Sequence, residues 1–286
     1  NDYYYSCVTK DSNNKWDLLG DIFIGRLSVD NESDLSHVVS KTMHNENEYC
    51  FEDWKKINTL AYGGSFTGAD PIKSHKYFCE DLPDWLNSIY NPAYSTTLID
   101  ATTGQGLWNE NYVNFLNNTG ANIVFHLGHG QTDAWCQGGN CYQTSLGALT
   151  INYKKDNLAN NGKYPFVISQ SCFTGAFSGA NNSDCMAESI IQYSATAGYV
   201  GYLGSWKAAG MDYTAPGEFP NSLQEKIMGA IYIDLSTILG EAVLEARIGV
   251  CDPNFVSSYN PFQFQHNLFG DPAYNLMAPG YEITQN

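Results

Sequence analysis

Short apolar runs alternate along this chain with amphipathic stretches of helical length. Six of these runs have the length of a strand and are mainly apolar, as in the buried strands of a parallel sheet. They lie at 21–26, 57–62, 96–99, 123–127, 165–170 and 199–203. Strands separated by helices favour an α/β fold, in which a mostly parallel sheet is covered by helices on both faces as a three-layer αβα sandwich.

Apolar residues at helical spacing predict the covering helices. The first expected helix begins at a polar cap at 31–34. The others are expected at 77–89, with a break near Pro83, and at 112–116, 186–191, 223–232 and 235–248. The aromatic tail between Tyr259 and Phe269 is expected to pack in the core, and His266 to be structural. No change in composition marks a second domain. Residues 1–286 are therefore predicted to form one domain, with 1–19 a loop or the remnant of a preceding subdomain.

The composition narrows the functional classes. Lys and Arg number 14 against 30 Asp and Glu, which gives a formal charge of −16. This charge argues against an extended phosphate-binding surface, and we expect no nucleic-acid partner. No run of eighteen apolar residues is present to form a transmembrane segment. Eight cysteines are more than a protein of the reducing cytosol usually carries, and they suit disulfide formation. We therefore predict a secreted or cell-surface protein.

The cysteine spacing allows disulfides without fixing their connectivity. Cys136 and Cys141 would close a small glycine-containing loop, and Cys50 with Cys79 is a second candidate bridge. Cys185 leads into an apolar helix and is expected to be a buried thiol.

Two of the buried strands end in residues suited to nucleophilic catalysis. The run at 123–127 leads into Gly128-His129-Gly130, and the run at 165–170 leads into Ser171-Cys172. Carboxyl ends of parallel strands are where α/β folds gather their chemistry. A cysteine attacks as a thiolate, and a histidine can take its proton. We therefore predict Cys172 as nucleophile and His129 as its base, with the Gly130 and Cys172 amides as oxyanion donors.

A metal site is the alternative interpretation of this region. His126 and His129 with Cys136 and Cys141 have spacings found in zinc sites. The intervening glycines offer no rigid helix to hold the two histidines, and an extracellular setting favours a disulfide. Strand alternation points His126 away from His129, so His126 is predicted to be a packed neighbour.

Several motifs together resemble the gingipain-type cysteine peptidases, family C25, relatives of caspases and legumains. The similar stretches are Asp21–Leu27, Gly128–Gly130 with Ala134-Trp135, Ser171–Gly175, Cys185–Glu188, Gly204–Trp206 and Phe269–Pro272. Their order and spacing cover most of the chain. The resemblance implies a caspase-like αβα sandwich and a thiol protease with Cys172 as nucleophile and His129 as general base and acid. It also implies that Trp206 lines the substrate pocket.

The function implied is that of a secreted cysteine endopeptidase acting on protein or peptide substrates. Catalysis would need no cofactor, and a pro-segment or flanking domains would be expected. Two alternatives stay open. A sortase-like transpeptidase would pass the thioester to an amine, and a catalytically inactive binding module would keep only the fold.

The chain departs from the family pattern at two positions. Where well-known members carry an acid before a Gly-Gly pair, this chain has Tyr62. Asp70 is the nearest candidate for the acid that selects Arg or Lys, at a different spacing. Some relatives bind structural calcium, for which Asp2, Asp11 and Asp17 are candidates here.

Overall fold

The computed structural model describes twelve stretches of the chain, to which every statement below refers. They are residues 2–10, 20–47, 52–64, 77–89, 94–101, 108–136, 149–150, 157–177, 184–208, 223–234, 236–250 and 265–276. Six strands form the central sheet. They are β1 (Ile57–Tyr62), β2 (Ser95–Asp100), β3 (Ile123–Leu127), β7 (Phe166–Gln170), β8 (Gly201–Ser205) and β9 (His266–Phe269). Their spatial order is β2-β1-β3-β7-β8-β9, and only β9 pairs antiparallel to its neighbour.

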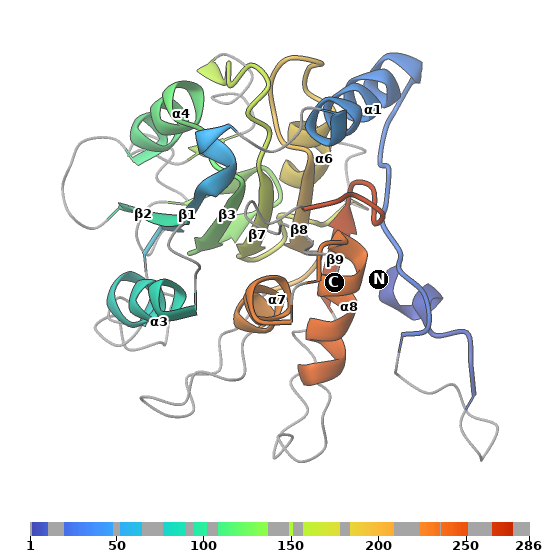
Figure 1. Ribbon diagram of the computed structural model, residues 1–286. Coiled ribbons are helices and arrows are strands. Elements are labelled where there is room, and N and C mark those ends of the chain that lie inside the picture. The colour runs from blue at the N-terminus through green and yellow to red at the C-terminus, as the bar shows by residue number, and fades with distance from the viewer. Residues whose placement is uncertain are drawn as a thin grey trace.

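Helices cover both faces of this sheet (Figure 1). On one side lie α1 (Glu32–Asn47), α4 (Trp108–Asn118) and α6 (Met186–Ile191), and on the other lie α3 (Leu82–Ile89), α7 (Leu223–Tyr232) and α8 (Leu239–Val250). Short helical turns are η1 (Asp2–Ser6), η2 (Asp53–Lys56) and η3 (Tyr77–Asp81). The predicted αβα sandwich with a mostly parallel sheet is confirmed.

The strands feed two separate apolar cores because side chains alternate between the two faces of a strand. Phe125 and Leu127 of β3 belong to the core beneath α3, α7 and α8. Val124 belongs to the core shared with α1, α4 and α6. Both faces of β1, β3, β7 and β8 are buried, which explains why these strands are mainly apolar.

The buried strand expected at 21–26 was wrong. Ile22 and Phe23 are 46% and 44% exposed, and the segment meets the sheet only where Arg26 bridges to Phe269. The Arg26 amide donates to the Leu268 carbonyl, and the Gly270 amide donates to the Arg26 carbonyl. The apolar residues of this segment therefore lie on the surface, outside both cores.

The helix predicted after the 31–34 cap is α1, but its buried face differs from the expected one. Asn31 caps it by accepting from the Asp34 amide at 3.1 Å. Of the apolar residues at helical spacing, Val38 is buried, whereas Leu35, Val39 and Met43 are 38–55% exposed. Lys41 is buried instead, and its Nζ donates to the carbonyl of Ile191 at the end of α6.

Three short strands and the antiparallel edge strand were not predicted. A second small sheet is formed by three strands of two residues each, which are β4 (Gly130–Gln131), β5 (Ala134–Trp135) and β6 (Leu149–Thr150). Two residues are too few for a periodic pattern to be read. For the region of β9 the sequence predicts only an aromatic tail. Its Phe269 is buried in the core, as expected. Tyr259, Phe262 and Phe264 lie outside the described residues.

Among the described helices, none combines the length and the apolar character that a membrane crossing needs.

Candidate active site

The strands that carry the predicted histidine and cysteine are neighbours in the sheet. β3 and β7 pair in parallel, with Leu127 opposite Gln170, so both strands end at the same level. His129 follows β3 by two residues and Cys172 follows β7 by two residues, and both side chains are half-buried. The sheet register therefore brings the two loops to one edge.

Gly130 is the point at which these two loops touch. A Cβ atom on Gly130 would lie 2.7 Å from the Cys172 carbonyl oxygen and 2.8 Å from the Ser171 Cβ. Such distances leave no room for any side chain at position 130. The histidine loop therefore packs directly on the backbone of the cysteine turn.

The amide of Gly130 points away from the hairpin in which it lies. In the β4–β5 hairpin, Gly130 is opposite Trp135, and the Cys136 amide donates to the His129 carbonyl at 3.0 Å. Hydrogen-bonded and non-hydrogen-bonded pairs alternate along an antiparallel ladder, so the Gly130–Trp135 pair is of the second kind. The Gly130 N–H is therefore not used by β5, as an oxyanion donor requires.

The turn after β7 has an unfavourable backbone conformation that the end of β8 holds in place. Phe173 has φ of 61°, in the left-handed region that non-glycine residues rarely adopt. Its amide donates to the Lys207 carbonyl at 2.9 Å, and the Gly175 amide donates to the Ser205 carbonyl at 2.8 Å. Backbone strain of this kind collects at functional turns. Here the strained residue comes directly after Cys172.

Three cysteines of the described residues bear on the candidate chemistry as thiols, and a fourth is disulfide-bonded. Cys79 and Cys185 are thiols whose pKa values are raised by burial, and the carboxylates of Asp100 and Glu80 raise that of Cys79 further. Cys172 is also a thiol. The buried thiol predicted at Cys185 is confirmed, and the Cys50–Cys79 bridge is wrong because Cys79 is reduced. Cys136 is disulfide-bonded, and Cys141 lies outside the described residues.

His126 is a packed neighbour of the site, as predicted. Its ring is fully buried and stacks on Trp135 with ring centroids 4.0 Å apart. Burial lowers the pKa of His126 well below its ordinary value, which leaves the ring neutral. The zinc interpretation fails on its donor atoms, because the Cys136 sulfur is already part of a disulfide.

Two of the remaining candidate residues, Tyr62 and Trp206, lie at or directly after the ends of strands of the central sheet. Tyr62, which precedes a Gly-Gly pair, is buried and packs on Phe78 with ring centroids 5.8 Å apart. Trp206 directly follows β8 and is half-buried, and the Lys207 Nζ lies 4.2 Å from its ring centroid. Asp70 lies outside the described residues.

Asp2, one of the three candidate calcium ligands, is already paired with a cation. Both of its carboxylate oxygens accept hydrogen bonds from the Arg26 guanidinium, at 2.9 and 2.6 Å. A carboxylate paired in this way with a cation does not fit a calcium site. Asp11 and Asp17 lie outside the described residues, so calcium at those positions stays a prediction.

Sequence reasoning missed the polar residues that lie beneath the two loops. Ser169, Ser171, Thr174 and Tyr202 are fully buried and hydrogen-bonded to one another. The available signal was the alternate placement of Ser169 at the end of β7 and Ser171 just after it, which turns both hydroxyls to the same side.

A histidine and a thiol that follow adjacent parallel strands are the arrangement expected of a cysteine peptidase. The chain belongs to peptidase family C25, whose sequence model matches residues 1–277. The predicted gingipain-type family and cysteine-peptidase class are therefore confirmed. A search of curated protein sequences finds no significant match.

Solved structures share the fold at low sequence identity. The chain is similar to the Arg-specific cysteine proteinase gingipain R, with TM-score 0.71 and 19% identity over 96% of this chain and 59% of that chain. It is also similar to the complex of Porphyromonas gingivalis RgpB pro- and mature domains, with TM-score 0.68 and 18% identity over 96% and 60% of the two chains. A structure described only as a protease gives TM-score 0.69 at 17% identity. The chain thus spans 59% to 60% of the length of these relatives.

Proposed function

We propose that this chain is the catalytic part of a cysteine endopeptidase that uses a Cys172–His129 dyad. The observation that carries the proposal is the packing of Gly130 on the Cys172 carbonyl oxygen, 2.7 Å from where a Cβ would lie. This contact holds the histidine loop against the cysteine turn. A nucleophile and its base must be held together in this way to react efficiently.

In the first half of the reaction, His129 takes the proton from the Cys172 thiol, and the thiolate attacks the peptide carbonyl carbon. The S–C bond forms as the carbonyl π electrons move onto oxygen, where the Gly130 and Cys172 amides stabilise the oxyanion. The C–N bond then breaks, and His129 gives its proton to the leaving amine. The acyl group stays on Cys172 as a thioester.

In the second half, His129 takes a proton from water, and the hydroxide oxygen attacks the thioester carbonyl. The C–S bond breaks, the carboxylic acid leaves, and the Cys172 thiolate takes the proton back from His129. An amine in place of water would give a new peptide bond, which is the transpeptidase alternative. No described contact favours that alternative over hydrolysis.

Cleavage after Arg or Lys is the proposed specificity, with Trp206 along the pocket and Asp70 as its acid. Support comes from the similarity of the fold to an Arg-specific proteinase. Lys207 already places a cation over the Trp206 ring. A second cation there would be repelled, so basic specificity depends on the Asp70 carboxylate.

We further propose that the protein is exported and is made with a pro-segment. The disulfide at Cys136 supports an oxidising compartment. The complex of RgpB pro- and mature domains supports a pro-segment, because that relative shares the fold.

Alkylation with iodoacetamide at pH 6.5, mapped by mass spectrometry, tests the proposal. We expect Cys172 to react at least roughly tenfold faster than Cys79, a half-buried thiol whose pKa is raised. Cys172→Ala should abolish hydrolysis of peptide substrates, whereas Cys79→Ala should leave it unchanged. Asp70→Asn should lower kcat/KM for Arg and Lys substrates by roughly 100-fold and leave other substrates unaffected.

Each alternative has its own outcome in these assays. Unchanged peptide hydrolysis in Cys172→Ala would rule out the Cys172–His129 dyad. Equal alkylation rates of Cys172 and Cys79 would favour the inactive binding module. Ligated product on addition of an amine would identify the transpeptidase. Equal cleavage after all residue types would remove Asp70 from the site.

A further inference from the structure

A chain of buried side-chain hydrogen bonds runs beneath the two candidate loops. The His126 Nδ1 lies 3.1 Å from the Ser169 Oγ, and the Ser169 Oγ lies 2.7 Å from the Ser171 Oγ. The Ser171 Oγ in turn lies 3.2 Å from the Thr174 Oγ1. All four side chains are fully buried. We call this set the buried polar chain.

Two aromatic residues close the buried polar chain on one side. Trp135 stacks on His126 with an interplanar angle of 7°, and its Nε1 donates to the Tyr202 hydroxyl at 2.9 Å. The Tyr202 hydroxyl also hydrogen-bonds with Ser169 and Thr174. Trp135 and Tyr202 are both fully buried. The polar groups are thus enclosed by ring faces and shielded from water.

The members of this set come from both sides of the proposed dyad. His126 and Trp135 precede and follow His129 in the chain, and Ser171 and Thr174 flank the turn at Cys172. The link between them crosses from β3 to β7, where His126 and Ser169 are paired in register. A hydrogen bond within this chain therefore fixes one loop relative to the other.

The shape of the site depends on this link at two points. A Cβ on Gly130 would lie 2.9 Å from the Ser171 Oγ, so the position of that hydroxyl limits how closely the histidine loop approaches. The strained Phe173 lies between two members, Ser171 and Thr174. Buried, mutually satisfied polar groups resist displacement because any movement leaves one of them without its partner.

We propose that His126 is a positioning residue of the peptidase reaction, which sets the Cys172 turn against the His129 loop through its hydrogen bond to Ser169. The inference rests on the proposed dyad. The His126 ring is neutral and fully buried, so it cannot contact the substrate. It acts on the reaction only through Ser169, Ser171 and Trp135. Loss of the Nδ1 hydrogen bond should loosen the two loops relative to each other and lower kcat more than it raises KM.

The test compares His126→Phe with Tyr232→Phe in the same chain. His126→Phe keeps a ring to stack on Trp135 and removes the Nδ1 bond. Tyr232→Phe removes a different buried side-chain bond, 2.8 Å to the Asn58 Oδ1 near the start of β1, away from the candidate site. Both should lower the unfolding midpoint, but only His126→Phe should change the chemistry.

We expect kcat to fall roughly 10- to 100-fold in His126→Phe, with KM within about twofold. The pH profile of Cys172 alkylation should move toward that of an ordinary thiol, because the thiolate is no longer held against His129. Tyr232→Phe should match the wild type in both measurements. Should His126→Phe fail to fold, Ser169→Ala carries the same expectation, since it removes one hydroxyl with little change in volume.

Two results would overturn the inference, and they are distinguishable. If Cys172 alkylates rapidly in the wild type and His126→Phe behaves like Tyr232→Phe, His126 is merely structural and the dyad survives. If Cys172 in the wild type reacts no faster than Cys79, the dyad itself is lost and this inference falls with it.

Discussion

The loops at the candidate site and the N-terminal segment are both held to the sheet by side-chain hydrogen bonds, but the bonds differ in kind. Beneath the site, neutral hydroxyl, imidazole and indole groups are fully buried and bonded to one another. The N-terminal segment, residues 2–10 and 20–30, is held by charged groups near the surface. We call this segment the N-terminal arm.

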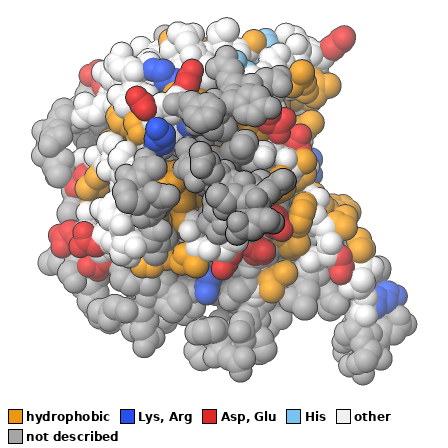
Figure 2. Space-filling model, in the orientation of Figure 1, with side chains coloured by type: hydrophobic (Ala, Val, Ile, Leu, Met, Phe, Trp, Pro, Cys, Tyr) orange, Lys and Arg blue, Asp and Glu red, His pale blue; other side chains and the backbone are white. Residues whose placement is uncertain are grey.

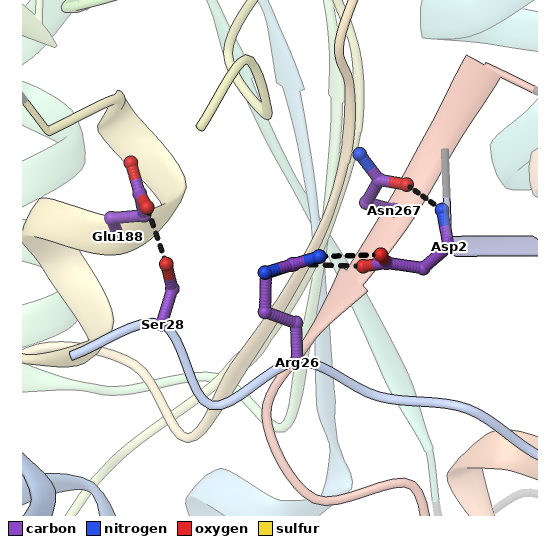
Figure 3. Close-up of polar contacts among 5 residues, drawn as sticks. All are labelled: Asp2, Arg26, Ser28, Glu188 and Asn267. Carbon is purple, nitrogen blue, oxygen red and sulfur yellow. Dashed lines mark hydrogen bonds and ion pairs between the residues drawn. The ribbon is translucent and has the colours of Figure 1, made fainter. Parts of the chain in front are cut away.

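Side-chain contacts that tie the N-terminal arm to α6 and β9 can be followed in Figure 3. Arg26 donates two hydrogen bonds to Asp2, the Asp2 amide donates to the Asn267 Oδ1 on β9, and Ser28 donates to Glu188 on α6. The Arg26 guanidinium also lies 3.9 Å from the Phe177 ring centroid. These bonds join the arm to α6 and β9 and do not reach His129 or Cys172 directly.

The surface around the arm is unusually apolar. Of the twelve large hydrophobic side chains that are exposed in the described part of the chain, eight lie between Tyr5 and Met43. Figure 2 shows hydrophobic side chains along the side on which α1 and the arm lie in Figure 1. The comparison teaches that the site is held by buried neutral groups, whereas the arm is held by a partly exposed ion pair together with backbone contacts to the edge strand.

The largest expected effect is that of Gly130→Ala. The new methyl group would meet the Cys172 carbonyl oxygen and the Ser171 side chain at 2.7–2.9 Å, so one of the two loops must move. A displacement of this size should lower kcat by roughly 100-fold or more. Peptide hydrolysis and Cys172 alkylation measure it.

Gly229→Ala in α7 is the matched control, because a Cβ there meets nothing within 4 Å. It should raise stability by about 0.5–1 kcal/mol and leave kcat unchanged. Full activity in Gly130→Ala would show that the loops are less tightly fitted than the contact implies.

A smaller effect concerns the pH dependence of stability through Lys41. Burial lowers the pKa of Lys41 to about 7, and its Nζ donates to the Ile191 and Ala197 carbonyls. The unfolded chain, with an ordinary lysine pKa, binds more protons than the folded chain above pH 7. Stability should therefore rise by about 2 kcal/mol between pH 7 and pH 9 from this group.

Urea unfolding of the wild type and of Lys41→Met at both pH values measures this difference. The rise with pH should be smaller by about 2 kcal/mol in Lys41→Met, since methionine does not titrate. Parallel pH dependence in the two proteins would mean that Lys41 keeps its proton in the fold.

The smallest expected effect is that of Arg26→Met in the N-terminal arm. The substitution removes the partly exposed ion pair with Asp2 while keeping an apolar chain near Phe177. Stability should fall by about 1 kcal/mol, and limited proteolysis of the arm should become faster. The kcat should stay within about twofold of the wild type. A large loss of kcat would contradict the separation between the arm and the site.

The predicted and observed bounds of helices and strands agree best where the segment with the apolar pattern is also buried in the core. β1, β3, α6 and α7 have the bounds that their apolar runs predicted. The 21–26 segment has a similar apolar run but lies on the surface, because only Arg26 pairs with the edge strand. The periodicity of α1 likewise did not reveal that its buried face carries Lys41, whose partners are carbonyls 150 residues away.

The sequence by itself determined the class of fold, the strand-end positions of His129 and Cys172, and the motifs of the family. These are local properties, since strand length, turn glycines and residue type can each be read from neighbouring positions. Only the tertiary structure decided that Gly130 packs on Cys172 and that His126 joins β3 to the hydroxyls beneath the nucleophile turn. Those contacts depend on the register between β3 and β7, which distant parts of the chain set together and no single stretch encodes.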